Sequence, residues 1–322
     1  MTQLLVRDAP FPIDVLPAGF EADLASAASG DPTGQLLKYL FRGFDDVLDD
    51  DAYHVTDDEA RLIQDVAPDV AETVGMGGHM IELGCGTASA VRAKTVPLVR
   101  ELRPTSYTAN DLWPEHAEAG RATVADAFPG LKVSALAADF MNAARPWPVT
   151  PGSVLCIGAT ISNLITDPTV DEAHDVLRGS LTHLARLAGP DGHMIVSYDT
   201  TRDGLALERI YNTAAHSRFR LGIVPMIDAL CRRDIDARLF SSPAVWSPRK
   251  QCLTHLLIPK ERIEADLARA PFVLERGQPL PLGVSYKFTP EVFAAAAGAA
   301  DIALSGRFTR TDNSAALETL SL

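Results

Sequence analysis

The sequence MIELGCGT at residues 80–87 decides the fold, because an apolar strand runs into a turn with two glycines and then into a helical segment. Gly84 and Gly86 lack the Cβ atoms that would keep a ligand away from the backbone, and the following helix presents unpaired N–H groups. A dinucleotide fingerprint, G-x-G-x-x-G, requires a third glycine at position 89, where this chain has Ser89. The turn therefore predicts a small-molecule site and argues against NAD, with a purely structural strand-to-helix turn as the alternative.

Strand and helix patterns alternate from about residue 60 onward. The expected strands cover residues 79–83, 106–110, 132–137, 153–157 and 193–198, and the expected helices cover 57–74, 88–102, 114–127 and 169–187. Strand, helix and strand at this spacing indicate a parallel sheet with helices on both faces. We therefore predict an α/β fold with a doubly wound, Rossmann-like sheet.

The alternation breaks near residue 219, which predicts a second, discontinuous α+β domain for substrate binding. The later segments are read as helices at 220–239 and 290–300, strands at 251–258 and 280–288, and an antiparallel strand pair at 301–308 and 315–320. These patterns assign residues 60–218 plus 289–322 to the doubly wound domain, and residues 1–59 plus 219–288 to the accessory domain.

The composition is that of a folded protein with an acidic balance. Forty-two acidic and 29 basic side chains give a net charge of −13, with 47% apolar and 22% charged residues among 322. These values argue against disorder, and the acidic excess argues against a nucleic-acid or anionic-membrane partner. We expect a monomer that binds a small molecule.

The cysteines and histidines lack the spacing of metal sites. Cys85, Cys156, Cys231 and Cys252 form no CxxC pair, and the eight histidines form no HExxH or H-x3-H pair. The first residues lack a basic segment followed by an apolar run, and no apolar stretch is long enough to span a membrane. We therefore expect a cytoplasmic protein with no metal, disulfide framework or membrane segment.

Acidic residues lie at the ends of the second and third expected strands. Asp111 is placed to accept hydrogen bonds from both ribose hydroxyls of a nucleoside, although an N-cap of the next helix is the alternative. Asp139 and Phe140 would bind the adenine amine and cover the base. Three strand ends with suitable residues in order favour an adenosine-containing ligand.

The form E-x-G-x-G-T resembles the first motif of class I S-adenosylmethionine-dependent methyltransferases, and later motifs narrow the resemblance. These motifs are GATISNL at residues 158–164, Tyr198-Asp199, ERIYN at 208–212 and VSYKFTPE at 284–291. Together, between Tyr53 and Glu291, they resemble the histidine-specific methyltransferase family of ergothioneine biosynthesis. That family also includes fungal N-methyltransferases of tryptophan derivatives.

The resemblance implies S-adenosyl-L-methionine as the cofactor. The residues that it places at this cofactor are Gly84, Gly86, Thr87, Asp111, Asp139, Phe140 and Gly158. The lysine that the family has shortly after the glycine motif is replaced by Ala90. Arg92 and Lys94 lie nearby, and the sequence leaves open whether either takes its place.

The resemblance also implies that three residues bind the α-amine and α-carboxylate of an amino-acid substrate. Tyr53 and Asn163 would orient the α-amine and are the catalytic candidates, while Tyr211 would bind the α-carboxylate. Since methyl transfer is an in-line displacement on a neutral amine, orientation is the main requirement and no dedicated base is needed. Ordinary half-buried packing is the alternative for both tyrosines.

Two departures bear on the substrate's side chain. Gly283 stands where the histidine-specific pattern has glutamate, while Ser285 remains; Thr254 falls where the family has methionine. A charged hydrogen bond contributes about 1.5–3 kcal/mol, so its loss should erode selectivity for histidine. We expect free volume beside Ser285 that indole would fill.

We therefore predict an S-adenosylmethionine-dependent N-methyltransferase that acts on the α-amine of an aromatic amino acid such as tryptophan or histidine. The alternatives are a histidine Nα-methyltransferase of the ergothioneine type and methylation of a side-chain nitrogen. A non-enzymatic sensor of S-adenosylmethionine or an amino acid is the alternative from another class. A nicotinamide oxidoreductase is disfavoured by the missing third glycine.

Overall fold

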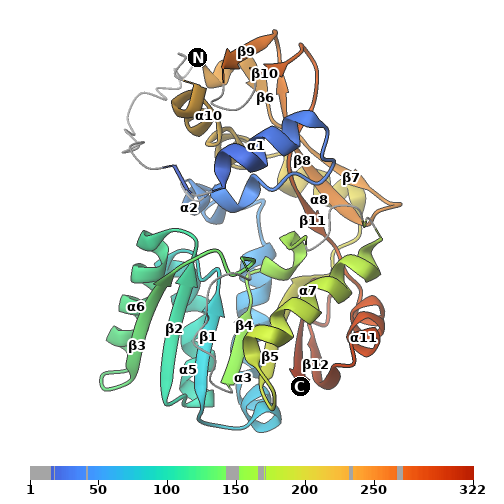
Figure 1. Cartoon of the computed structure of the whole chain (residues 1–322). Coiled ribbons are helices and arrows are strands. Elements are labelled where there is room, and N and C mark those ends of the chain that lie inside the picture. Colours follow the sequence, from blue (N-terminus) through green and yellow to red (C-terminus); the bar gives the residue numbers. More distant parts are fainter. Residues whose placement is uncertain are drawn as a thin grey trace. The chain divides into compact units, whose positions relative to one another are not determined.

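One mixed sheet organises the larger part of the chain (Figure 1). Its strand order is β12 (Ala303–Thr309), β13 (Ala315–Ser321), β5 (His193–Asp199), β4 (Gly152–Cys156), β1 (His79–Leu83), β2 (Ser106–Asp111) and β3 (Lys132–Ala137). Strands β1 to β5 are parallel, and β13 runs antiparallel to both β5 and β12. The predicted doubly wound α/β fold is confirmed.

The chain leaves β1 toward β2 and β3, and returns to β4 on the other side of β1. The strand order therefore reverses between β1 and β4. Ligands of open α/β sheets bind at the carboxyl ends of the strands beside such a switch point. The turns after β1 and β4 are thus the first places to look for a site.

Side chains on the central strands alternate between two cores, as the two-residue period of a strand requires. Ile81 and Val154 pack in one core, and Met80 and Leu155 pack in the other. The first core includes residues of α7 (Ala173–Ala188) and α11 (Pro290–Ala299); the second includes residues of α3 (Val55–Val74), α5 (Val96–Leu102) and α6 (Pro114–Ala127). Helices therefore cover both faces of the sheet.

The segment 88–102, expected as one helix, contains a π-helical turn. It divides into α4 (Ala88–Ala90), η2 (Val91–Thr95) and α5. Pro97 has no N–H to give to the carbonyl oxygen of Ala93, and that oxygen instead accepts a hydrogen bond from Gln64 Nε2 of α3 at 2.9 Å. The wider, π-helical turn thus occurs beside Pro97 at the start of α5, and Gln64 of α3 satisfies the carbonyl oxygen that it leaves without a helical partner.

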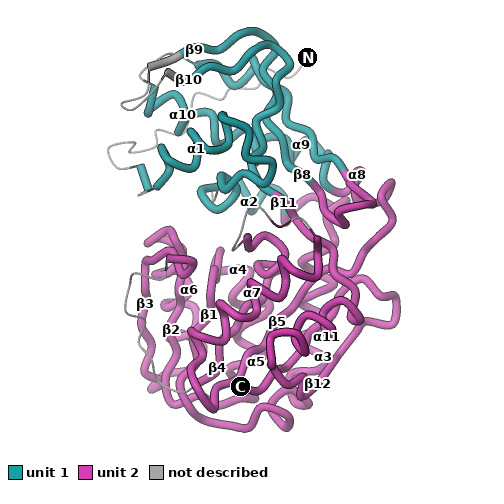
Figure 2. Tube along the Cα trace, turned by 45° about the vertical axis from the view of Figure 1, so that its right-hand side comes forward, with its two compact units in different colours: residues 1–47, 211–245, 254–283 teal, residues 48–210, 246–253, 284–322 magenta. Residues whose placement is uncertain are grey.

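The structure is a computed structural model that describes residues 16–17, 19–40, 43–142, 152–165, 170, 172–231, 235–266 and 271–322. Contacts divide the chain into two units (Figure 2). Unit 1 comprises residues 1–47, 211–245 and 254–283, and unit 2 comprises residues 48–210, 246–253 and 284–322. Unit 2 contains the mixed sheet.

Unit 2 takes in three segments that the predicted boundaries left in the accessory domain, residues 48–59, 246–253 and 284–288, while unit 1 takes in residues 211–218. Residues 48–59 belong to it because α3 begins at Val55 and packs along β13 and α5. Residues 284–288 belong to it because Val284, Tyr286 and Phe288 are buried in the core beside α7 and α11.

Unit 1 combines short helices with small antiparallel sheets. Its elements are α1 (Phe20–Ser29), η1 (Leu37–Tyr39), α2 (Phe44–Leu48), α9 (Ala214–Leu221), α10 (Val224–Cys231), η4 (Ala237–Leu239), β6 (Phe240–Ser241), β7 (Ala244–Ser247), β8 (Cys252–Pro259), β9 (Ile263–Asp266), β10 (Pro271–Leu274) and β11 (Leu280–Tyr286). The ends of α2, β7, β8 and β11 continue into unit 2. The single helix predicted over 220–239 is wrong, because Gly222 ends α9 and Pro225 lies at the start of α10.

Strand β8 pairs with β11, β6 and β7, and β9 pairs with β10. The remaining helical elements are η3 (Thr160–Asn163), in unit 2, and α8 (Gly204–Tyr211), which lies in unit 2 except for Tyr211. In the described ranges, no helix is both long and apolar enough to cross a membrane. The same ranges contain no group of three or more His, Cys, Asp or Glu side chains placed to hold a metal ion.

Candidate functional site

The turn after β1 has the backbone that its glycines predict. Gly84 and Gly86 have φ angles of 65° and 69°, in the left-handed region that favours glycine. A Cβ atom on Gly86 would meet no described heavy atom within 4 Å. Thr87 is the N-cap of α4, and its Oγ1 accepts a hydrogen bond from Ala90 N. The turn therefore leaves open space for a ligand beside its backbone.

Asp111 joins the ends of β1 and β2. Its buried carboxylate accepts a hydrogen bond from Gly86 N at 3.1 Å and another from Trp113 N at 3.0 Å. The N-cap of α6 is Trp113, so the alternative role of Asp111 as that N-cap is wrong. Each carboxylate oxygen has a second lone pair, so the group can still accept two ribose hydroxyls.

The third strand end is also ordered by its own polar groups. Asp139 accepts a hydrogen bond from Met141 N at 3.0 Å, and Phe140 packs half-buried against the core beside α7. Asn110 donates from Nδ2 to the carbonyl oxygen of Ala138, which ties this turn to β2. The open glycine turn and the acidic groups at these strand ends fit an adenosine-containing ligand.

The turn after β4 is held by Glu59, which is paired with Lys94, and the sequence did not predict this contact. Gly158 has a φ of 80°, and its N–H donates to Glu59 Oε1 at 2.6 Å. The second oxygen of Glu59 accepts from Lys94 Nζ at 3.2 Å, and Ser197 also donates to this carboxylate. No local signal marks Glu59, since acids in the first turns of helices are usually solvated. The buried Glu59–Lys94 pair thus supports Gly158.

Lys94 is a structural partner of Glu59, although it also approaches the predicted cofactor residues. A Cβ atom on Gly158 would lie 3.0 Å from Lys94 Nζ. Lys94 lies four residues after Ala90, one helical turn further along the chain. The structure thereby brings a buried cation to the end of β4.

Asn163 and Ser285, both predicted to contact the substrate, contact each other. Ser285 Oγ donates a hydrogen bond to Asn163 Oδ1 at 2.6 Å. Asn163 ends the 3-10 turn η3 after β4 and is exposed, whereas Ser285 is buried. These two predicted residues, 122 positions apart in the chain, therefore form one polar unit at the edge of the sheet.

Tyr53 lies in unit 2, just before α3. It is buried, and its backbone N–H donates to the carbonyl oxygen of Asp50 at 2.7 Å. Glu59, in the same helix that follows Tyr53, reaches the turn after β4. The start of α3 is thus held at the carboxyl edge of the sheet.

Tyr211 and Thr254 belong to unit 1. The Tyr211 ring lies 5.1 Å from the ring of His216 and 5.8 Å from that of His255, measured between centroids. Its carbonyl oxygen accepts a hydrogen bond from Nη1 of the buried Arg220 at 2.7 Å. Burial lowers the pKa of Arg220 to about 10, since desolvation disfavours its charged form. Thr254 is half-buried in β8, next to His255.

The free volume expected at Gly283 is not present. A Cβ atom on Gly283 would lie 2.6 Å from Cδ1 and 2.7 Å from Cγ of Leu37. The Leu37 side chain therefore occupies the space that the missing side chain was expected to leave. This contact joins residues far apart in the sequence, and no local pattern could have revealed it.

Glu82, in β1, is a buried acid beneath the glycine turn. It accepts hydrogen bonds from Thr95 Oγ1 at 2.7 Å and from Tyr107 Oη at 2.5 Å. Burial raises the pKa of Glu82 to about 7, although both hydroxyl donors act in the opposite direction. Burial likewise raises the pKa of the neighbouring Cys85 thiol, so Cys85 is not a reactive thiolate.

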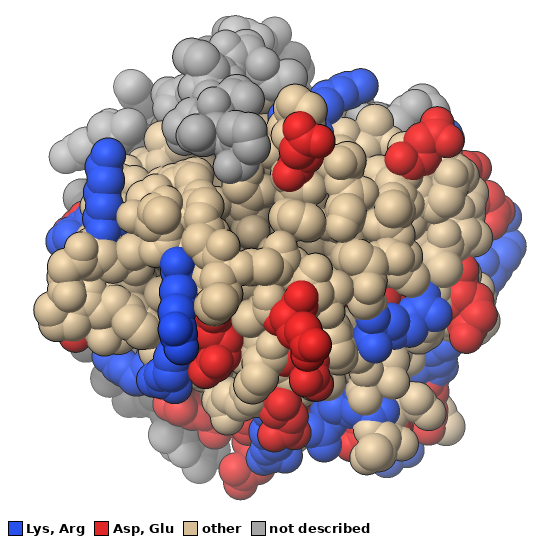
Figure 3. Space-filling model, turned by 90° about the horizontal axis from the view of Figure 1, so that it is seen from below, with Lys and Arg blue, Asp and Glu red and all other residues tan. Residues whose placement is uncertain are grey.

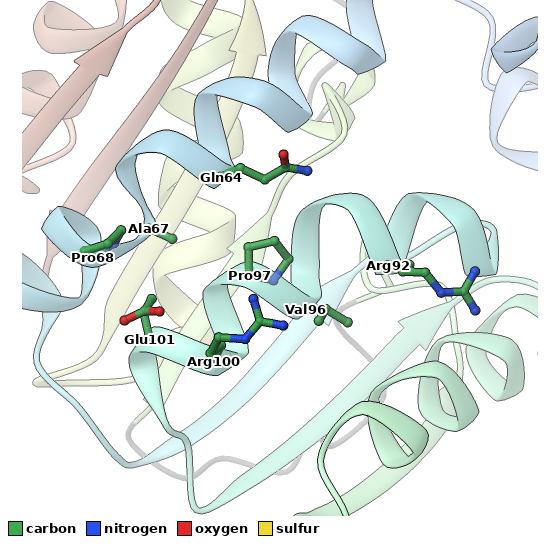
Figure 4. A pocket seen from close by; sticks show the side chains of 8 residues that line it. All are labelled: Gln64, Ala67, Pro68, Arg92, Val96, Pro97, Arg100 and Glu101. Carbon is green, nitrogen blue, oxygen red and sulfur yellow. The ribbon is translucent and has the colours of Figure 1, made fainter.

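A cavity of about 400 Å³ lies elsewhere in unit 2 (Figure 4). Its lining residues, which include Pro68, Pro97 and Arg100, come from α3, η2 and α5. Arg92, one of the two basic residues near the glycine motif, lines it, whereas none of the residues predicted to bind the cofactor or the substrate does.

The face in Figure 3 mixes acidic and basic side chains. Blue and red groups alternate around tan areas, and no continuous basic region covers the described part of this face. Nucleic-acid binding requires such a region. This view agrees with the net charge of −13.

Comparison with known proteins identifies relatives of the chain. A family model described as a histidine-specific, S-adenosylmethionine-dependent methyltransferase matches residues 41–322. The N-methyltransferase fsqC of Aspergillus fumigatus is 22% identical over 240 residues, which cover 73% of this chain and 64% of that protein. The N-methyltransferase dtpB of Aspergillus flavus is 30% identical over 92 residues, 29% of this chain and 24% of that protein. The chain thus spans less than two thirds of these relatives.

Solved structures with a similar chain trace include two methyltransferases. An S-adenosylmethionine-dependent methyltransferase from Clostridium acetobutylicum has a TM-score of 0.43 and 11% identity, covering 81% of this chain and 91% of that one. The 1,6-didemethyltoxoflavin-N1-methyltransferase of Burkholderia thailandensis has a TM-score of 0.44 and 14% identity, covering 98% and 92%.

The family match includes the glycine turn after β1, the residues at the next two strand ends and the turn after β4. It extends over most of the chain, and the predicted resemblance is confirmed. The protein belongs to the histidine-specific, S-adenosylmethionine-dependent methyltransferase family, and S-adenosylmethionine is its cofactor.

Proposed function

We propose that the protein transfers the methyl group of S-adenosylmethionine to the α-amine of a free aromatic amino acid such as tryptophan or histidine. The observation that carries this proposal is the hydrogen bond from Ser285 to Asn163, since it joins two residues that the family resemblance assigns to the substrate. It lies in the unit that contains the glycine turn and Asp111. The names of the two Aspergillus relatives support nitrogen as the acceptor atom.

The cofactor supplies an electrophilic methyl group on a sulfonium, and the chain supplies orientation. Asp111 would bind the ribose hydroxyls, and Gly84 and Gly86 would let the ligand approach the backbone of the turn. Asp139 and Phe140 would bind adenine. Alignment of two reactants can lower the activation free energy by about 7–11 kcal/mol. No strong base is required of these residues.

Asn163 and Tyr53 would orient the α-amine. Asn163 is exposed and its amide is already engaged by Ser285, so it presents a fixed acceptor to an amine N–H. An amine that donates through N–H keeps its lone pair free to attack the methyl carbon. The family resemblance assigns the α-carboxylate to Tyr211, whose carbonyl oxygen accepts a hydrogen bond from Arg220.

A methylation assay of the purified protein with a mixture of amino acids tests the proposal. The wild-type chain is incubated with S-adenosylmethionine and the twenty amino acids, and tandem mass spectrometry locates any added methyl group. We expect addition on an α-nitrogen, and we expect Asn163→Ala and Tyr53→Phe to lower kcat far more than cofactor affinity. Donor binding without any methylated amino acid would favour the sensor, and a methyl group on a side chain would overturn the α-amine assignment.

A further inference from the structure

We propose that Ser285 is a positioning residue that sets the orientation of the Asn163 amide, and so acts on the amine of every substrate through Asn163. This inference rests on the proposed function. It extends the role that the sequence predicts for Ser285, which is contact with the substrate's side chain.

In this geometry the hydroxyl proton of Ser285 points at Asn163 Oδ1 and forms a hydrogen bond with it. The distance of 2.6 Å from Ser285 Oγ to Asn163 Oδ1 is at the short end of O–H···O hydrogen bonds. A serine hydroxyl has one proton and two acceptor sites. With its proton directed at Asn163, Ser285 can only accept a hydrogen bond from the substrate.

The orientation of the amide decides whether the amine can react. Terminal amide torsions have broad, roughly two-fold preferences, so an exposed asparagine can present either its oxygen or its NH2 group. The oxygen accepts an amine N–H and leaves the lone pair of nitrogen free. A rotated amide would instead donate to that lone pair and oppose attack. The structure has the first orientation, in which Asn163 Oδ1 accepts from Ser285 Oγ, and loss of that hydrogen bond would leave the amide free to rotate.

Ser285 is itself held in place from the following residues of the chain. Lys287 Nζ lies 2.6 Å from Asp199 Oδ2, and both side chains are 1% exposed. The backbone N–H of Lys287 donates to Gln251 O at 2.8 Å, and the rings of Tyr286 and Phe288 stack with 3° between their planes. These contacts hold the end of β11 in place, and with it the Ser285 Oγ that donates to the exposed Asn163.

The direct and positioning roles differ in which substrates they affect. If Ser285 serves only to accept a hydrogen bond from an imidazole or indole N–H, its loss matters only for side chains that carry such a group. If Ser285 acts through Asn163, its loss slows methylation of every amino acid that the enzyme accepts. Acceptor pairs that differ only in the side-chain N–H distinguish these roles.

The test compares Ser285→Ala, Ser285→Thr and Asn163→Ala, with Ser162→Ala as the matched control. Ser162 is a buried serine in the same turn as Asn163, and its hydroxyl has no hydrogen-bond partner among the described residues. The acceptors are tryptophan with its benzothiophene analogue, and histidine with its thiazole analogue. kcat and KM are measured for each accepted compound, and S-adenosylhomocysteine affinity is measured by calorimetry.

We expect Ser285→Ala to lower kcat about 10²-fold for both members of an accepted pair, which is the usual effect of misplaced reactants. Ser285→Thr should restore most of the rate, Ser162→Ala should leave it unchanged, and affinity for S-adenosylhomocysteine should stay constant. Because the effect passes through Asn163, adding Ser285→Ala to Asn163→Ala should cause no further loss.

Two kinds of result would overturn the inference. A loss confined to the acceptors with a side-chain N–H, or a rise in KM at constant kcat, would assign Ser285 to the side chain alone. Full additivity of Ser285→Ala and Asn163→Ala would show that the residues act separately. In both cases the wild-type chain still methylates amino acids, whereas a wild-type chain that binds the donor but methylates none refutes the proposed function and, with it, this inference.

Discussion

Replacement of Gly283 by alanine should destabilise the protein because Leu37 occupies the space that the new methyl group needs. The added Cβ would lie 2.6, 2.7 and 3.1 Å from three carbon atoms of the Leu37 side chain, whereas carbon atoms prefer about 3.5–4.0 Å. The φ angle of Gly283 lies outside the left-handed region, so the expected cost comes from packing and not from backbone strain.

The Leu37 side chain has little freedom to retreat. Leu36 N donates to Leu282 O at 2.7 Å, and a Cβ atom on Gly34 would lie 2.4 Å from Pro281 O, so this segment is held close against β11. Overpacking of this kind costs about 1–3 kcal/mol, and we expect Gly283→Ala to reach the upper part of that range.

A double-mutant cycle with Leu37→Ala measures the contact. Leu37→Ala removes two of the three closest atoms, so the double variant should recover about 0.5–3 kcal/mol relative to the sum of the single variants. Unfolding in urea, followed by circular dichroism, gives the free energies, and calorimetry with S-adenosylhomocysteine checks that unit 2 is intact. A Gly283→Ala variant within about 0.3 kcal/mol of wild type, or strict additivity in the cycle, would refute the reasoning.

The remaining predictions concern the donor site and pH. Asp111→Ala should weaken binding of S-adenosylhomocysteine by about 1.5–3 kcal/mol in calorimetry, and unchanged affinity would contradict the assignment of the β2 end. Burial raises the pKa of Glu82 from 4.5 to about 7, so the folded state binds a proton more tightly than the unfolded state. The stability that this proton contributes is present below about pH 4.5 and is lost as pH rises toward 7, amounting to about 3 kcal/mol. Urea unfolding measures the free energy of unfolding of Glu82→Gln and wild type between pH 4.5 and 7.5. Relative to wild type, the variant should become more stable by about that amount as pH rises. A difference in unfolding free energy that does not change with pH would contradict this pKa.

Histidine selectivity should be tested in a background that makes room for the acid. Gly283→Glu alone would meet Leu37, so its effect on specificity would be confused with a packing defect. Combined with Leu37→Ala, it tests whether an acid at this position raises kcat/KM for histidine over tryptophan, by at most about 150-fold. No change in that ratio would show that residue 283 does not read the substrate's side chain.

Local sequence determined much of the sheet and the backbone of the glycine turn. The strands at residues 79–83 and 132–137 have the predicted bounds, and the antiparallel pair at the C-terminal end forms as expected. Glycines with positive φ and an acid at the end of β2 could also be recognised directly, because each depends on neighbouring residues. Such features follow from backbone sterics and from the two-residue period of strands.

Only the tertiary structure decided how distant segments complete the site. Gly158 N donates to Glu59 across 99 positions, and Ser285 Oγ donates to Asn163 across 122. Leu37 fills the space beside Gly283, which the sequence predicted to be free. These contacts depend on which surfaces pack together after the chain has folded, and side chains far apart in sequence carry no local pattern that announces their partner. The glycine turn and the acidic strand ends were therefore predictable from short motifs, whereas the contacts of Gly158 and Asn163 with distant residues required the fold.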